Sequence, residues 1–155
     1  MFLGEYTHSI DDKGRLTIPS KFREVLDNGA VITRGYDRYL VIYPADTFQK
    51  LAEKVTSLSP TDPENRLLFR FVFAGASDLP LDKAGRINIP AFLRTYAGLD
   101  SEVIVVGAGQ YIEVWNPADW QAQLDQVNNA DTNAERFAFL NLSVHSTNDH
   151  TPPAD

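Results

Sequence analysis

Two copies of an Asp-x-x-Gly-Arg motif are the residues of this 155-residue sequence whose types and spacing best suit recognition chemistry. Arg15 follows Gly14 in the first copy, and Arg86 follows Gly85 in the second. We expect each glycine to adopt a positive φ and each arginine to begin a strand, so that its guanidinium projects from a hairpin tip. A guanidinium matches a phosphate group or the O6/N7 edge of guanine, and a two-stranded ribbon is narrow enough to enter the DNA major groove.

The aspartates that open the two copies, Asp11 and Asp82, allow two interpretations. Each carboxylate could hold its arginine in one rotamer, or it could accept backbone N–H bonds within the turn. A purely structural interpretation treats the motif as turn chemistry with an Asp–Arg pair and no ligand. Turns of this composition are common, so the motif taken alone favours the structural interpretation.

Further basic residues lie close to the first motif in the sequence. Lys13 lies in the first turn, and Lys21 and Arg23 follow the first hairpin closely enough to reach a phosphate backbone, whereas the second copy keeps only Arg94 after its strand. The alternative for these side chains is a solvated face of mixed charge.

The charge balance argues against a nucleic-acid partner when it is taken alone. The net charge is −7 and the pI is about 4.9. Residues 1–77 hold 10 basic and 10 acidic side chains, so the whole acidic excess lies in residues 78–155, which hold 4 basic and 11 acidic side chains. Binding to nucleic acid usually depends on a basic surface.

The sequence offers no convincing catalytic or metal-ligating set. Asp11, Asp12 and Asp82 are the candidates for the paired acids of a hydrolase. Asp12 is replaced by Lys83 in the second copy, however, and His8, three residues before Asp11, is interpreted as a half-exposed strand residue rather than a base. Cysteine is absent, and the histidines are too few for a typical zinc site; they are His8, His145 and His150. We therefore expect a protein that is not an enzyme and that has neither a cofactor nor a metal.

An internal repeat accounts for the two motifs. Residues 11–23 recur as residues 82–94 at a spacing of 71, and Pro-Ala-Asp at 44–46 recurs at 117–119 at a spacing of 73. The order of elements survives both insertions, so the chain is a duplicated unit. Half of a small β-barrel cannot bury its own apolar face, and we therefore expect the two repeats to pair about a pseudo-two-fold axis.

Both repeats predict the same series of elements. A short strand over 16–18 or 87–89 leads to a helix that begins after a proline and ends at Gly29 or Gly98. Two strands and a closing helix follow, over 30–34, 39–43 and 45–57 in the first repeat and over 102–106, 111–115 and 118–128 in the second. Residues 103–106 are continuously apolar, which predicts a strand buried on both faces.

The predicted organisation has five parts. The first repeat spans 1–58, and a connecting helix opened by Pro63 lies within 59–77. The second repeat spans 78–130, a C-terminal helix covers 131–142, and 143–155 is expected to be a disordered tail. No basic segment precedes an apolar run at the N-terminus, and no run of about 18 apolar residues occurs, so we expect a cytoplasmic protein without membrane spans.

A resemblance to a known family rests on residues 1–6, both Asp-x-x-Gly-Arg-x-x-Ile-Pro copies, residues 69–76 and Glu-Val-Trp at 113–115, and it runs from residue 1 to about residue 142. These segments together resemble the MraZ family of bacterial transcriptional regulators, which are encoded at the start of the division and cell-wall gene cluster. The resemblance implies an α+β fold in which two tandem AbrB-like (SpoVT/AbrB-type) swapped-hairpin motifs form a pseudo-two-fold β-barrel with flanking helices. It also implies that the subunits assemble into a ring-shaped homo-oligomer.

The resemblance carries a functional expectation as well. MraZ proteins bind G-rich direct repeats of double-stranded DNA in the promoter of their own operon, usually as repressors, which implies association with the nucleoid. The implied DNA contacts are Arg15 and Arg86, extended to Lys13, Lys21 and Arg23, with the turns supported by Asp11, Gly14, Asp82 and Gly85. A ring that presents several hairpins on one face would multiply weak contacts through effective concentration, which reconciles DNA binding with the acidic pI.

Two other functions stay open at this level. An AbrB-type antitoxin or a general chromosome-associated protein would show little preference between G-rich repeats and random duplex. A ring-forming scaffold without DNA binding would suit the acidic composition, but it would not need an arginine in both turns.

Overall fold

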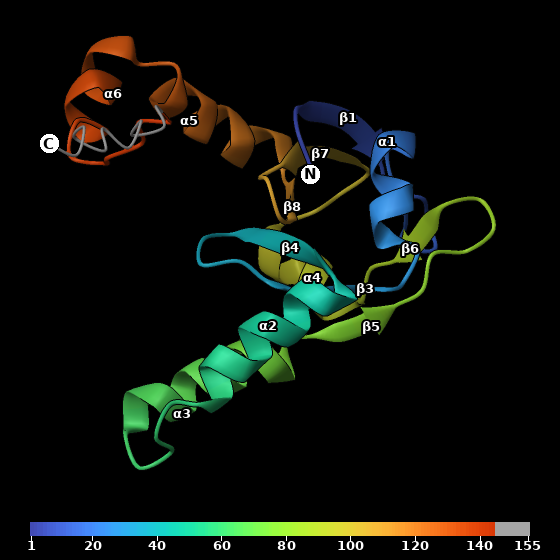
Figure 1. Cartoon of the computed structure of the whole chain (residues 1–155). Helices are drawn as coiled ribbons and strands as arrows, with labels where there is room; N and C mark the ends of the chain where they lie inside the picture. The colour runs from blue at the N-terminus through green and yellow to red at the C-terminus, as the bar shows by residue number, and fades with distance from the viewer. Residues whose placement is uncertain (145–155) are drawn as a thin grey trace, which may run out of the picture. The chain divides into compact units, whose positions relative to one another are not determined.

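A six-stranded antiparallel sheet and a two-stranded ribbon form the framework of the fold (Figure 1). The sheet has the order β1-β7-β8-β4-β3-β5, and β2 pairs with β6 in the ribbon. The strands are β1 (Glu5–Ser9), β2 (Arg15–Thr17), β3 (Ala30–Arg34), β4 (Tyr39–Pro44), β5 (Ser77–Leu79), β6 (Arg86–Asn88), β7 (Glu102–Gly107) and β8 (Ile112–Trp115). The helical segments are α1 (Ser20–Arg23), η1 (Glu24–Leu26), α2 (Ala45–Thr56), α3 (Pro63–Phe69), η2 (Arg70–Ala74), α4 (Ala91–Ala97), α5 (Pro117–Val127) and α6 (Ala130–Arg136).

The computed structural model describes residues 1–144 and divides the chain into two compact units, Met1–Ala122 and Gln123–Asp155. The first unit contains every strand of the described residues together with helices, so the α+β class is confirmed. The tail expected over 143–155 lies outside the described residues except for Ser143 and Val144. Across residues 1–144, no helix is both long enough and apolar enough to cross a membrane.

The strand order is symmetric with respect to the two repeats. Exchanging the repeats maps β1 onto β5, β7 onto β3 and β8 onto β4. Strand β1 of the first repeat pairs with β7 of the second, and β5 of the second pairs with β3 of the first. The expected pairing between repeats is therefore confirmed, whereas β1 and β5 remain edges of an open sheet, and closure into a barrel is not confirmed.

Strands β1 and β2, which flank the first motif, do not form a regular hairpin ladder. A single bridge between Ile10 and Leu16 joins them, and their main partners belong to the second repeat. The ribbon is thus made from one strand of each repeat, with Leu16 opposite Ile87 at its centre. This exchange brings the two motifs to the same place in the molecule.

The ribbon and the sheet enclose one apolar core. Leu16, Ile18, Ile87 and Ile89 are at most 1% exposed, and they alternate with polar residues, so the ribbon has one buried face and one solvent face. In β7 only Val103 and Val105 are buried, and Ile104 and Val106 are half-buried. The prediction that this strand is buried on both faces is wrong, because an apolar run does not show whether a second layer covers its outer side.

Most of the residues that were expected to begin or end a helix do so in the structure. The side chain of Asp62 accepts from the Glu64 amide at 2.9 Å to open α3, and α4 ends at Gly98, whose φ is 62°. The C-terminal helix expected over 131–142 ends at Arg136 instead. Phe139 beyond it is 93% exposed, and a short helix without a packed apolar face is marginal in water.

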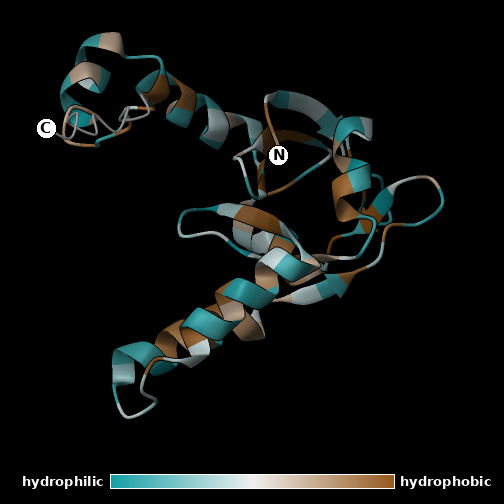
Figure 2. Ribbon diagram, in the orientation of Figure 1, coloured by the Kyte–Doolittle hydropathy of each residue, from teal (hydrophilic) through white to brown (hydrophobic). Residues whose placement is uncertain are grey.

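Helices α2 and α3 lie against each other in the first unit. Figure 2 shows hydrophilic residues along the visible side of α2, and α3 is hydrophilic in its first part and hydrophobic over its last three residues. Leu67 of α3 nevertheless stays 56% exposed. A single copy of the chain therefore leaves part of the apolar surface of α3 uncovered.

A carboxylate of β8 lies among aromatic side chains. Trp115 Nε1 donates to Glu113 Oε1 at 3.0 Å, and the Trp115 ring stacks on Tyr39 with the ring centroids 4.6 Å apart. Burial raises the pKa of Glu113 above its ordinary value, although the hydrogen bond from Trp115 opposes the shift. The folded protein therefore holds the carboxyl proton more tightly than the unfolded chain does.

We predict that Glu113→Gln stabilises the protein at pH 7 and has little effect at pH 4. A carboxyl group whose pKa is raised on folding supports stability below its unfolded pKa of about 4.3, and that support is lost as the pH rises through the folded value. Glutamine is neutral throughout and keeps an acceptor for the Trp115 indole. Urea unfolding at the two pH values measures the difference, with exposed Glu102→Gln as the control. An equal effect of Glu113→Gln at both pH values would contradict the assignment.

Candidate nucleic-acid interface

The first motif is a turn organised by one carboxylate. Asp11 Oδ1 accepts from the backbone amides of Lys13 at 3.0 Å and of Arg15 at 2.9 Å. Asp11 Oδ2 accepts from Arg15 Nε at 2.7 Å. A single aspartate thus closes the backbone turn and fixes the arginine side chain.

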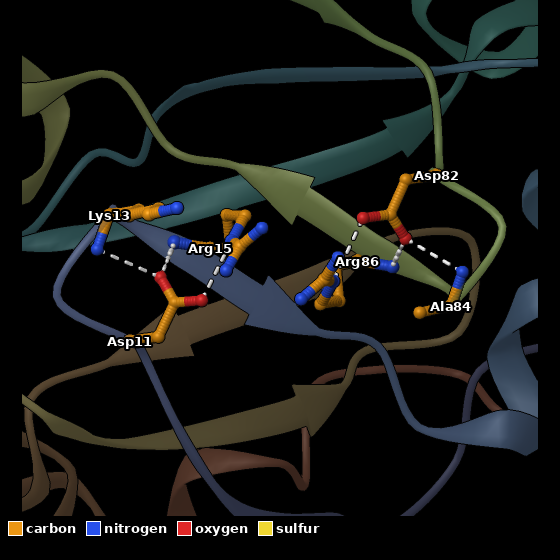
Figure 3. A network of polar contacts seen from close by, with 6 residues as sticks. All are labelled: Asp11, Lys13, Arg15, Asp82, Ala84 and Arg86. Carbon is orange, nitrogen blue, oxygen red and sulfur yellow. Dashed lines mark hydrogen bonds and ion pairs between the residues drawn. The ribbon is translucent and has the colours of Figure 1, made fainter.

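The second motif repeats this arrangement, as Figure 3 shows. Asp82 Oδ1 accepts from the amides of Ala84 and Arg86, both at 2.9 Å, and Asp82 Oδ2 accepts from Arg86 Nε at 2.8 Å. The two roles considered for the aspartates, turn closure and rotamer control, therefore occur together in both copies.

The hydrogen bonds also set the charge of the two aspartates. The backbone hydrogen bond from Arg15 holds the pKa of Asp11 below its ordinary value, and that from Arg86 does the same to the pKa of Asp82. Together with the side-chain hydrogen bond from the same arginine, these bonds outweigh the upward effect of desolvation on both pKa values. The carboxylates are consequently charged at neutral pH, which is the state that accepts all three donors.

The guanidinium groups keep donors for a ligand. Only Nε of each arginine is bonded to its aspartate, and within residues 1–144 neither Arg15 nor Arg86 has a second side-chain partner. The side chains of Arg15 and Arg86 are 31% and 33% exposed. The terminal nitrogens thus form a donor pair that is fixed in direction and open to solvent.

The register of the ribbon places four polar residues on one face. Arg15 lies opposite Asn88, and Thr17 lies opposite Arg86. Opposed residues of an antiparallel pair point to the same side, and the intervening Leu16–Ile87 pair points into the core. We call the solvent side, made of Arg15, Thr17, Arg86 and Asn88, the ribbon face. Sequence reasoning missed Thr17 and Asn88, although period-2 alternation from Leu16 and Ile87 was a signal for them.

The glycines of the motifs have two structural roles. Gly14 and Gly85 have φ values of 80° and 73°, which confirms the expected positive φ. Their carbonyls also accept from the other repeat: Ile89 N donates to Gly14 O and Ile18 N donates to Gly85 O, both at 2.9 Å. Each turn is therefore fastened to the strand of the opposite copy.

Arginines of the short helices pack on these glycines. Arg23 Nε donates to Ile18 O at 2.9 Å, and its side chain lies where a Cβ on Gly85 would be. Arg94 Nε donates to Ile89 O at 3.2 Å, and its Cζ would lie 3.0 Å from a Cβ on Gly14. The contact of Arg23 with DNA stays a prediction, and the structure adds a positioning role that it shares with Arg94.

The other predicted basic residues, Lys13 and Lys21, make no side-chain hydrogen bond or ion pair within residues 1–144. The side chains of Lys13, in the first turn, and Lys21, in α1, are exposed. Their equivalents in the second repeat, at the spacing of 71, are Ala84 and Phe92. Asp12 of the first turn is matched by Lys83 in the second, so one acid and two lysines in the first repeat face a single lysine in the second, and the formal charge at these three positions is the same in both repeats.

Among the described residues, neither the large cavity beside α2 nor any metal-type cluster involves the motifs. A cavity of about 1100 Å³ lies near the N-terminus and α2, with Phe2, Lys50 and Tyr111 among its lining residues. Among the residues that the structure describes, no group of three or more His, Cys, Asp or Glu side chains could hold a metal ion. The motifs form an open surface, which suits a large ligand rather than an enclosed small molecule.

We predict that Gly85→Ala destabilises the protein more than Gly109→Ala. Both glycines have a positive φ, at 73° and 83°, so both substitutions carry strain of about 1–2 kcal/mol. A Cβ at residue 109 meets no atom within 4 Å, whereas one at residue 85 must displace Arg23 and its hydrogen bond to Ile18, which adds about 1 kcal/mol. Urea unfolding gives both values. Equal losses would show that the Arg23–Gly85 contact contributes nothing.

The family model that matches the chain is described as "MraZ protein, putative antitoxin-like", and it matches twice, at residues 1–71 and 72–141. These two matches cover the two copies of the motif and agree with the repeat seen in the sequence.

Proteins named "Transcriptional regulator MraZ" are similar over most of the chain. The one from Thermomicrobium roseum is 54% identical over 125 residues, which cover 81% of this chain and 88% of that protein. The one from Roseiflexus castenholzii is 47% identical over 138 residues, covering 89% and 94%. The one from Desulfitobacterium hafniense strain Y51 is 43% identical over 144 residues, covering 93% and 100%. With two matches to the family model and relatives of this similarity, the chain belongs to the MraZ family.

Proposed function

We propose that this protein is a DNA-binding transcriptional regulator that contacts DNA through the ribbon face. The observation that carries the proposal is the pair of arginines on one solvent face, each held by its own aspartate at Nε and open at its terminal nitrogens. The name "Transcriptional regulator" of relatives at 43–54% identity supports it.

The geometry suits readout of guanine. Arg15 and Arg86 are diagonal neighbours across the ribbon, a relation that places Cα atoms about 7–8 Å apart in antiparallel sheets. A guanidinium that donates two parallel bonds to O6 and N7 of guanine must be held in one plane. The Asp–Arg bond already restricts that plane before DNA binds, so less side-chain entropy is lost on binding.

The finer proposal is binding to G-rich direct repeats in the promoter of the protein's own operon, with repression of the division and cell-wall cluster, by a ring of subunits with barrel-like cores. The sequence resemblance supports this reading. The partly uncovered apolar surface supports self-assembly, since Leu67 and Phe92 are 56% and 51% exposed in one chain. Several weakly binding ribbons in one ring offset the net charge of −7 through effective concentration.

The antitoxin-like description of the family favours a second candidate, a DNA-binding antitoxin or general chromosome-associated protein. The two candidates differ in sequence preference. A general binder relies on phosphate contacts and distinguishes little between G-rich repeats and scrambled duplex. A scaffold without DNA binding has no use for two arginines that are fixed in direction yet open to solvent.

We predict that Arg15→Ala and Arg86→Ala each lose about 1–3 kcal/mol of preference for the upstream DNA over a scrambled duplex, while the fold is retained. Fluorescence anisotropy with the protein's own upstream DNA, near physiological salt, measures both affinities. Arg136→Ala, which removes the same charge from α6, is the matched control.

Two outcomes would contradict this proposal. If the folded wild-type protein binds neither duplex, the scaffold interpretation replaces the regulator. If Arg15→Ala unfolds the protein, the Asp11–Arg15 pair is a structural element of the turn, as the motif taken alone suggested.

We predict a different effect for Lys21→Ala. An exposed lysine beside the ribbon contacts phosphate and not base edges, so its loss weakens binding to both duplexes alike. The slope of log affinity against log salt concentration falls by about 1 per lost phosphate contact. Lys54→Ala on α2 is the control, and a selective loss for the upstream DNA alone would show that Lys21 reads bases.

A further inference from the structure

We propose that Thr17 and Asn88 determine which way round the protein lies on its DNA. The inference deepens the proposed function and rests on it. It concerns the two residues of the ribbon face that are not arginines.

The ribbon face has a pseudo-two-fold axis at the Leu16–Ile87 pair. The register pairs Arg15 with Asn88 and Thr17 with Arg86, and rotation about this axis exchanges residues at the spacing of 71. Arg15 and Arg86 are exchanged with each other, and so are Thr17 and Asn88. One half of the face is therefore Arg15 with Asn88, and the other half is Arg86 with Thr17.

The two arginines cannot distinguish the two orientations that this axis relates. They have the same chemistry and the same aspartate bond, at 2.7 and 2.8 Å, so either orientation presents equivalent guanidinium groups to the same bases. A direct repeat has a direction, because its sequence differs when read from the opposite side. On the ribbon face, only the difference between Thr17 and Asn88 can match that direction.

The side chains of Thr17 and Asn88 differ in the bases that they can recognise. An asparagine amide can bond N6 and N7 of adenine together, whereas a threonine offers a hydroxyl and a methyl group that contacts the thymine methyl. Within the described residues, no hydrogen bond engages either side chain, and the side chain of Asn88 is exposed. Asparagine is also disfavoured in strands, so its place in β6 has no explanation from strand propensity.

Other differences between the repeats lie outside the ribbon face. They include Lys13 against Ala84 and Lys21 against Phe92, in the turns and short helices. Lysines at such positions neutralise phosphates, and phosphate contacts carry no direct sequence information. Orientation through base readout is thereby assigned to residues 17 and 88.

Three variants test the inference: Thr17→Asn, Asn88→Thr, and the exchange of both. Each places at one position the residue that the equivalent position already accepts, which preserves the fold. The sequence contains no cysteine, so Ala84→Cys gives a unique site in the second turn for an iron–EDTA cleavage reagent. Bound to duplex from the upstream DNA, the labelled protein cuts the strand near that turn and so reports its orientation on each DNA repeat.

We expect the labelled protein in which Thr17 and Asn88 are unchanged to cut one flank of each DNA repeat at least about five times more than the other flank. Both single variants should cut the two flanks about equally, and the exchange should reverse the preferred flank. An unchanged flank in all variants, or equal cutting by the wild type, would overturn the inference and leave the regulator proposal standing. Absence of wild-type binding to the upstream duplex would overturn the proposed function and the inference together.

Discussion

The whole arrangement depends on a reciprocal backbone contact between the two repeats. The amides of Ile18 and Ile89 each donate to the carbonyl of the glycine in the opposite turn, at 2.9 Å. Arg23 and Arg94 reinforce the contact, since each carries a bond to its own strand end and packs on the glycine of the other copy. Neither turn could keep its position without the other repeat, because β2 and β6 are only three residues long.

This contact explains how a small acidic protein can present a defined basic site. The buried side of the ribbon is anchored by four aliphatic residues, which leaves the opposite side rigid without a further layer of structure. Each aspartate then uses its negative charge to organise a turn and to aim a guanidinium, so part of the acidic composition serves the basic site directly. Net charge alone is therefore a poor guide to the partner of this fold.

The local structure was largely predictable from the sequence, whereas the contacts between repeats were not. Gly14 adopts the positive φ expected of it, Gly98 ends α4 and Pro63 begins α3, as predicted. These signals could be found in the sequence because turns and helix ends depend on neighbouring residues. The packing of Arg23 on Gly85 joins residues far apart in the chain, and no local pattern encodes it. Thr17 and Asn88 were not predicted because a three-residue strand is too short for the alternation of apolar and polar residues to be convincing. Helix α6 ends before the predicted residue because its apolar positions have no surface to pack against.

The exchange of strands between repeats also constrains how the protein is made. Glu5 of β1 pairs with Val106 of β7, about 100 residues later in the chain. A ribosome has therefore released most of the polypeptide before the first strand can find its partner, and until then β1 is an unpaired edge open to other nascent chains. The same exchange would let two separate single-repeat chains build this sheet as a dimer, so the fold of one chain is what a fused ancestral dimer would look like.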